Sequence, residues 1–366
     1  MKISHELSLT MRGIAIMFIA LHNFFHLEVF GLPQENETVF SMDRTTEFFL
    51  QLFSGNPHVV GILLSFIGWC GVPVFVLLSG YGLSKKYGRR DEKINELSFI
   101  KYNYLKLLSL ILPAVIFFLT FYSIEGSWKT VLKGLFSLTF LNTFIPGFNS
   151  IAPPFWYFSL TFQLYLAFLL LYRVKNWKVL TVIGIIFLSL YIVVGPDCLQ
   201  SDILLKRMRL TLFGWIPVFV IGILLARDNN ILMTKAYIDD NMGNCVKYGI
   251  LSILIIVSLV LLTLVNKNYY LWILMPFIAI VFFYSIALLV ERVPGINSVS
   301  LWLGKFSPYI FVSHPIALLV IEHVFNDLIT DMPLSLLAVM YTLLFLTISS
   351  IYNILHLRIL KLINKQ

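Results

Sequence analysis

The chain has 366 residues, of which 58% are hydrophobic and only 13% charged, and its mean hydropathy is +0.86. A soluble domain carries about a quarter of its residues as charged side chains, so the composition excludes an ordinary water-soluble protein. In a soluble protein the net charge of +8 would suggest a nucleic-acid partner, but here we attribute it to membrane topology and expect no nucleic acid.

Apolar stretches long enough to cross hydrocarbon, about 20 residues of helix, recur along the chain. They predict an all-α polytopic membrane protein with about ten transmembrane helices, built as one integral-membrane domain over residues 1–366 with no appended soluble domain. The stretch 131–148 is apolar but short, and Pro146-Gly147 interrupts it, so we predict a re-entrant or interfacial segment there. The predicted spans are 9–30, 58–83, 99–122, 155–172, 177–195, 209–226, 246–265, 268–290, 306–325 and 334–357.

Basic residues are unequally distributed between the two sides of this topology. With the N-terminus inside, the inner loops and tails hold 19 Lys and Arg residues and the outer loops hold seven, which with Arg12 accounts for all 27. The positive-inside rule therefore predicts a multi-pass protein of the cell inner (plasma) membrane with both termini cytoplasmic. The basic cluster at 206–209 is the exception, because it lies on the outer side.

The first predicted span contains ionisable side chains, which are costly in hydrocarbon and by default indicate a functional site. On a helix, Asn23 lies about 20° from Arg12 around the axis, His26 about 40° and His22 about 80°, so one face carries all four. The histidines lie roughly 15 and 21 Å above the arginine. We predict catalytic roles for Arg12, His22 and His26; the alternative is that the arginine reaches lipid head groups and the histidines only hydrogen-bond between helices.

Around the inner end of the second span, the stretch "GVPVFVLLSGYGLSKKYGRR" (71–90) combines small residues with a basic cluster. The small side chain of Ser79 permits close approach of a helix or a ligand. A phosphate-rich donor would suit the basic cluster, whereas the positive-inside rule and anionic membrane lipids explain the same charges without a donor. The basic residues of this predicted donor site are Lys85, Lys86, Arg89, Arg90, Lys101 and Lys106.

Two later spans also contain polar residues. In "PPFWYFSLTFQLYLAF" (153–168), Trp156 suits an outer aromatic belt and Gln163 needs a partner in hydrocarbon. In "SPYIFVSHPIALLV" (307–320), His314 lies about 12 Å into the helix, and Pro315 after it frees a backbone carbonyl. A structural hydrogen bond between helices is the alternative role for His314. The cysteines are far apart in the sequence, so we expect neither a disulfide framework nor a metal site.

Taken in order, these segments resemble the integral-membrane acyltransferase-3 family. "MRGIAIMFIALHNF" resembles its first-helix Arg-to-His segment, and "GVPVFVLLSGYGLSKKY" resembles its Gly-x-x-x-F-F-x-L-S-G-F/Y segment. "FIKYNYLKLLSLILP", "WYFSLTFQLYL" and "SPYIFVSHP" resemble its third-span start, its W-x-L-S-x-E-x-Q-x-Y-L segment and its S-x-x-x-Y-L-x-H-x-P segment. The similarity covers nearly the whole chain.

The resemblance implies a membrane-embedded O-acyltransferase. Such a protein would move an acyl group from cytoplasmic acyl-CoA to a hydroxyl of a cell-surface sugar, polysaccharide or glycolipid. The absence of a long lipid-chain signature favours acetyl, and hence acetyl-CoA. A first-helix histidine would act as general base, since a hydroxyl must lose its proton as it attacks the thioester. The residues then expected to bind substrate are Asn23, Ser79, Tyr81, Trp156, Gln163, Tyr309 and His314.

The chain departs from the family pattern in two places. The family usually has ten residues between its arginine and histidine, whereas Arg12 and His22 are separated by nine and Asn23 occupies the strict register position. Acidic residues often found in the fourth-span motif are replaced by Thr161 and Phe162. The alternative class is a transporter or exporter of a polysaccharide or lipid-linked sugar, because buried histidines and Pro-interrupted spans also suit a proton-linked permease. An inactive or structural relative is a third alternative.

Overall fold

The computed structural model describes residues 3–88, 94–124, 128–145, 150–196, 198–227, 244–324 and 332–363. These residues form helices and no strand, which confirms the all-α class. The α-helices are α1 (His5–Phe25), α2 (Met42–Phe53), α3 (Val59–Ile67), α4 (Val72–Tyr87), α5 (Glu96–Ile124), α6 (Trp128–Ser137), α7 (Trp156–Leu171), α8 (Trp177–Val193), α9 (Ser201–Leu210), α10 (Leu212–Arg227), α12 (Asn244–Leu264), α13 (Tyr269–Trp272), α14 (Met275–Val290), α15 (Pro294–Val324) and α17 (Leu334–Ile363). Short 3₁₀ turns are η1 (Glu28–Phe30), η2 (Gly68–Gly71), η3 (Asn142–Phe144), η4 (Pro153–Phe155) and η5 (Val265–Lys267).

Seven helical segments of the described chain are long and apolar enough to cross a membrane, and α9 with α10, which meet at a 43° bend, would make an eighth. Helices α8 and α14 are apolar but shorter. Each of the ten predicted spans overlaps one of these helices, so the polytopic architecture is confirmed and the number ten is approximate. Between 128 and 145 the structure has only α6 and η3, neither of which is long enough to span.

The first span differs from its predicted bounds at both ends, because its ends are set by capping rather than by hydropathy. Helix α1 begins at His5, where the Ser4 side chain accepts a hydrogen bond from the Leu7 N–H at 2.9 Å, and it ends at Phe25 rather than at residue 30. His26 is therefore the C-cap residue of α1. The chain turns away directly after it and can fold back over the end of the helix.

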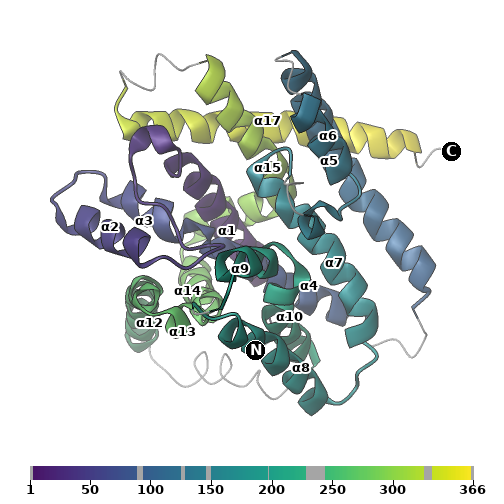
Figure 1. Ribbon diagram of the computed structural model, residues 1–366, viewed down its shortest axis with the longest axis horizontal. Helices are drawn as coiled ribbons and strands as arrows, with labels where there is room; N and C mark the ends of the chain where they lie inside the picture. The colour runs from purple at the N-terminus through teal and green to yellow at the C-terminus, as the bar shows by residue number, and fades with distance from the viewer. Residues whose placement is uncertain are drawn as a thin grey trace.

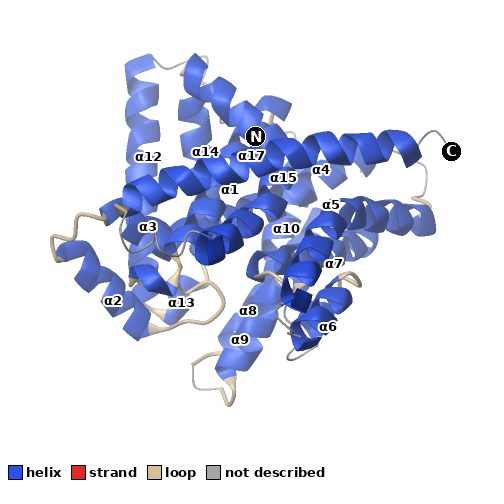
Figure 2. Ribbon diagram, turned by 90° about the horizontal axis from the view of Figure 1, so that it is seen from above, coloured by secondary structure: helices blue, strands red, loops and turns tan. Residues whose placement is uncertain are grey.

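Helix α1 passes through the middle of the helical bundle, and its most extensive packing is against α15 (Figures 1 and 2). The two backbones approach closely because each has a glycine at the crossing: a methyl group on Gly13 would collide with the Ser300 carbonyl, and one on Gly304 with the Leu9 carbonyl. Small residues at such crossings are typical of helix packing in membranes. This close packing fixes the face of α1 that carries the predicted site.

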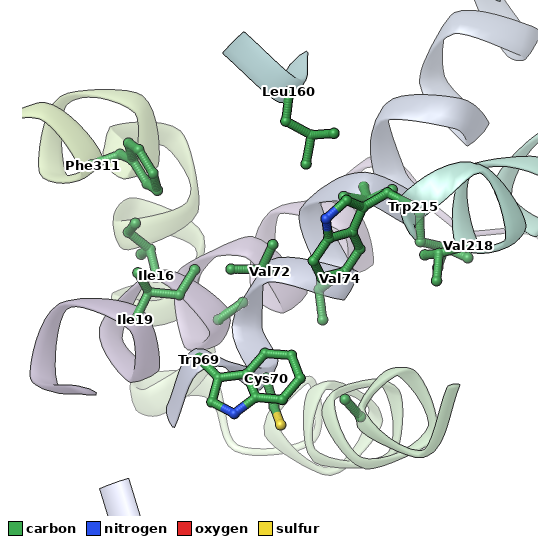
Figure 3. Packing of buried hydrophobic residues seen from close by; sticks show 14 of the residues in the cluster. Ile16, Ile19, Trp69, Cys70, Val72, Val74, Leu160, Trp215, Val218 and Phe311 are labelled. Carbon is green, nitrogen blue, oxygen red and sulfur yellow. The ribbon is translucent and has the colours of Figure 1, made fainter. Parts of the chain in front are cut away.

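The core beside α1 is built around the break between α3 and α4. Trp69 and Cys70 of η2 and Val72 of α4 lie between Ile16 and Ile19 of α1 and the helices on the other side (Figure 3). Trp69 and Cys70 are each only 1% exposed. The short 3₁₀ segment therefore brings an aromatic side chain next to the outer half of α1, where the cavity described below begins.

Candidate functional site

A cavity of about 540 Å³ lies beside the C-terminal end of α1. Its wall combines the end of α1 with the loop that follows it, the η2 turn, the start of α4, α5, α6, η3, η4, the start of α7, α9 and α15. Residues far apart in the sequence thus meet at one place. Among those that line it are His22, Asn23, His26, Glu35, Glu37, Trp69, Lys133, Thr143, Trp156, Tyr157 and Lys206. A second cavity, of about 510 Å³ between α1, α3 and α17, is lined almost entirely by apolar side chains and offers little chemistry.

A close polar contact in the cavity at the C-terminal end of α1 joins an imidazole to a carboxylate. His26 Nδ1 lies 2.7 Å from Glu35 Oε2, and the two side chains are 32% and 12% exposed. Because Nδ1 faces the carboxylate, we assign the proton of the neutral imidazole to Nδ1, which leaves Nε2 as an unprotonated acceptor. A carboxylate in this position also stabilises the imidazolium that forms when Nε2 takes a proton.

His22 is held more rigidly and more deeply. Its Nδ1 lies 3.1 Å from the Leu64 carbonyl oxygen, to which it donates, and the residue is only 5% exposed. The His22 and His26 rings are 5.2 Å apart between centroids, one helical turn from each other. Gly68 packs directly against His22, because a methyl group there would lie 2.6 Å from the His22 Cβ. The prediction that the two histidines face one cavity is confirmed.

The two carboxylates in the loop after α1 have opposite pKa shifts. Burial opposes ionisation of Glu35, but the His26 contact and the nearby imidazoles outweigh it and lower the pKa of Glu35 to about 2. For Glu37, burial and then repulsion by Glu35 raise the pKa to about 8, against an opposing effect of Arg209. At neutral pH the cavity therefore holds one carboxylate paired with His26 and one carboxyl that is mostly neutral.

His22, His26 and Glu35 also have the donor types of a zinc site, and their donor atoms lie within 4.8 Å of one another. Two donors on a tetrahedral zinc with bonds of about 2.0–2.1 Å are roughly 3.3 Å apart. The 2.7 Å between His26 Nδ1 and Glu35 Oε2 is instead the distance of a direct contact. In this arrangement the two atoms are too close together for both to be ligands of one zinc ion.

Of the other predicted substrate residues, Asn23 and Trp156 line the cavity. His314 does not line it, but its ring packs edge-on against Phe311, a cavity residue, with 5.6 Å between centroids. It is fully buried, and its Nε2 has no hydrogen-bond partner among the described residues. His314 thus lies immediately behind the cavity wall.

Gln163 forms structural hydrogen bonds instead of facing the cavity. Its Nε2 donates to Thr143 Oγ1 at 2.8 Å, and its Oε1 accepts from the Leu212 N–H at 3.0 Å. Only 1% of the residue is exposed. The buried amide therefore ties η3 to the start of α10 and holds Thr143 in the cavity wall.

Three predicted residues lie away from the cavity. Ser79 donates to the Phe75 carbonyl at 2.8 Å and reaches the cavity only through its contact with Tyr157. Tyr81 donates to the Ile3 carbonyl at 3.2 Å. Tyr309 contacts His356 Nδ1 at 3.3 Å, in a network between α5, α15 and α17. The described structure does not bring Tyr81 and Tyr309 to the cavity wall.

The predicted donor site is at the other end of α1. Arg12 and Lys86 both interact electrostatically with Lys106, and Lys86 lies over the rings of Tyr87 and Tyr102 at 5.1 and 5.4 Å. Lys85 lies over the Tyr81 ring at 5.5 Å. Lys101 is exposed. The predicted Arg89 and Arg90 lie outside the described residues.

Two functional candidates were missed by the sequence predictions. Glu35 lies in the loop after the first span, nine residues after His26, and no spacing rule links the two. Tyr157 follows Trp156 at the start of the fourth span; it lines the cavity and also interacts electrostatically with Arg12. It therefore lies between the histidine cavity and the basic end of α1. An aromatic residue at the start of a span gave no signal of that position.

Comparison with known proteins gives one match. A family model described as an acyltransferase domain matches residues 10–354, which is nearly the whole chain and includes α1, the cavity and α15. No curated protein and no solved structure matches the chain.

Proposed function

This chain belongs to the acyltransferase-3 family of membrane acyltransferases, and on that premise we propose that it transfers an acetyl group from cytoplasmic acetyl-CoA to a hydroxyl of a cell-surface sugar, polysaccharide or glycolipid. The observation that carries the proposal is the contact between His26 and Glu35 in a polar cavity at the end of α1. An imidazole oriented by a carboxylate is suited to removing the proton of a hydroxyl nucleophile.

In the proposed reaction the acceptor hydroxyl oxygen attacks the thioester carbonyl carbon while His26 Nε2 takes the hydroxyl proton. The Glu35 carboxylate stabilises the resulting imidazolium. The carbon–sulfur bond then breaks, and the leaving thiolate takes the proton from His26, which yields the ester and free CoA. His22 lies one turn deeper with its Nδ1 held by the Leu64 carbonyl, and we assign it to positioning the acyl group beside His26.

The donor would bind at the opposite end of α1. Arg12, Lys86 and Lys106 form a cluster of positive charge suited to the phosphates of CoA. Along the helix axis His22 lies about 15 Å and His26 about 21 Å from Arg12, so the pantetheine arm would have to be extended to bring the thioester to His26. Its path would pass Tyr157, which interacts with Arg12 and lines the cavity.

The proposal is tested with purified protein, radiolabelled acetyl-CoA and cell-envelope glycans. We expect label in the glycan with the wild type and a loss of about 10²–10⁴-fold with His26→Ala, in preparations whose folding is verified by thermal unfolding. Retained transfer in His22→Ala, His26→Ala and the double variant would show that neither histidine is the base. Glycan movement into or out of sealed vesicles without any acylation would identify a transporter instead.

A further inference from the structure

Two lysines line the cavity that contains His26. Lys133 belongs to α6 and Lys206 to α9. Neither side chain has an ion pair or a hydrogen bond within the described part of the chain. Lys133, which is partly buried, and Lys206, which is exposed, thus line the same cavity as the histidine pair with no partner among the described residues.

Neither carboxyl group of the cavity forms an ion pair with these lysines within the described chain. Glu35 is in contact with His26 instead, and its single negative charge offsets only part of the positive charge of the two lysines. Burial and the nearby Glu35 raise the pKa of Glu37 to about 8, although Arg209 opposes the shift, so Glu37 is mostly uncharged at neutral pH. The positive charge of Lys133 and Lys206 is therefore available to a ligand.

A third cation strengthens the field behind the wall. Arg209, on the same helix as Lys206, is 1% exposed and lies over the rings of Trp69, Tyr191, Trp215 and Trp272 at 4.5 to 5.7 Å. Its Nε, Nη1 and Nη2 atoms have no hydrogen-bond partner among the described residues. Since it has no ion pair among the described residues, its charge adds to the positive potential at the neighbouring cavity wall.

Membrane orientation does not explain this concentration of charge. Helix α9 carries the cluster 206–209, which the overall distribution of Lys and Arg places on the outer side. Basic residues near span ends are enriched on the cytoplasmic side, so a cluster on the outer side runs against that trend. Arg207 has a structural use, because its Nη1 donates to the Thr143 carbonyl at 2.8 Å. Lys206 has no such contact among the described residues; it is exposed and lines the cavity.

We propose that Lys133 and Lys206 bind an anionic group of the acceptor, a carboxylate or a phosphate, and hold the neighbouring hydroxyl at His26. This inference rests on the proposed acyl transfer and names the class of its acceptor: an acidic glycan, such as one with uronate or glycerol-phosphate units. The two lysines belong to different helices and line one cavity, so both are available to contact one bound anion.

The test measures binding without acetyl-CoA, so that it does not depend on catalysis. The full chain is reconstituted in phosphatidylcholine nanodiscs, which offer no anionic lipid. Equilibrium dialysis measures binding of a labelled glucuronate-containing oligosaccharide, of the same oligosaccharide after carboxyl reduction, and of a glycerol-phosphate oligomer. We expect at least one acidic probe to bind about tenfold or more tightly than the neutral oligosaccharide, and the preference to weaken with added salt.

The lysine variants then locate the binding. Lys133→Gln with Lys206→Gln should reduce acidic-probe binding by about tenfold and leave neutral-probe binding unchanged. Lys129→Gln is the matched control, because Lys129 is on the same helix as Lys133, is exposed and does not line the cavity. Equal binding of acidic and neutral probes, or no effect of the double variant, overturns the inference. An effect of the double variant that is seen only in nanodiscs containing phosphatidylglycerol also overturns the inference, since the lysines would then hold lipid head groups.

A transfer assay separates this inference from the proposed function. Envelope glycans are divided by anion exchange into acidic and neutral pools before incubation with labelled acetyl-CoA. We expect label in the acidic pool. Label confined to the neutral pool would contradict the acidic acceptor but support acyl transfer. Absence of label in both pools would contradict acyl transfer itself, while the binding assay would still decide whether the lysines hold an anion.

Discussion

Replacing Glu35 with glutamine removes the negative charge next to the His26 imidazole, the group proposed to act as base, with almost no change in side-chain shape. In the wild type, His26 Nδ1 is 2.7 Å from Glu35 Oε2. Glutamine at this position cannot stabilise an imidazolium by charge, and its amide group can present a donor to Nδ1. We therefore expect Glu35→Gln to slow transfer and to leave the fold intact.

The size of the effect follows from the geometry. With delocalised charge centres about 4 Å apart and an effective dielectric constant of about 20, an imidazolium and a carboxylate attract each other by ~4 kcal/mol. The two side chains are 32% and 12% exposed, so water screens part of this attraction. A remaining ~3 kcal/mol in the transition state corresponds to roughly a hundredfold loss of kcat/KM.

The assay compares kcat/KM for label transfer from acetyl-CoA in the wild type, Glu35→Gln and Glu28→Gln. Glu28 follows α1 in the same connection, is exposed and does not line the cavity, so its variant should match the wild type. In the double variant that combines Glu35→Gln with His26→Ala, kcat/KM should be little lower than in His26→Ala alone, because the carboxylate acts through the His26 ring. Full activity in Glu35→Gln, or losses that add independently, would refute the pairing.

Three further predictions test the surroundings of the pair. Gly68→Ala should lower kcat by about tenfold or more and lower the free energy of unfolding by about 1–3 kcal/mol through overpacking. The reason is that the new methyl group would lie 2.6 Å from the His22 Cβ and must displace it. Kinetics and thermal unfolding measured in parallel check this, and an unchanged kcat contradicts it. Gln163→Leu should destabilise the protein by about 2–4 kcal/mol, since Thr143 and the Leu212 N–H lose their partner. Transfer activity per folded molecule should persist, and a large drop in it would restore a substrate role for Gln163. The folded-state pKa of Glu37, about 8, lies above its ordinary value of 4.5. Between these pH values the native chain keeps a proton that the unfolded chain has released, so the contribution of Glu37 to stability falls as pH rises. The Tm of Glu37→Gln should therefore fall less than that of the wild type between pH 5 and pH 9, and an identical pH dependence of the two Tm values would contradict the shift.

The parts of the fold that depend on local sequence could be predicted. An uncharged apolar stretch of about 20 residues has few stable arrangements in a membrane other than a spanning helix, so each predicted span has a corresponding helix. The shared face of His22 and His26 follows from helical periodicity alone. The end of α1 at Phe25 was predicted less well, because hydropathy continues beyond the residue at which the helix is capped.

The parts of the site that depend on tertiary contacts could not be predicted. Glu35 reaches His26 only because the loop after α1 folds back over the helix end, and no periodicity encodes that turn. Gln163 was expected to need a partner in hydrocarbon, but its partners, Thr143 and Leu212, belong to segments 20 and 49 residues away. Tyr309 shares a helix with His314, yet it is directed to the network with His356. Helix packing decides which of these polar residues reach the cavity.

Chemical rescue tests the assignment of the base most directly. Label transfer from acetyl-CoA is measured for His26→Ala and His22→Ala with and without added imidazole, which can occupy the space left by the removed ring. We predict that imidazole restores a substantial part of the lost transfer in His26→Ala and little in His22→Ala. Full activity of His26→Ala without imidazole, or rescue of His22→Ala alone, would contradict the assignment of His26 as the general base.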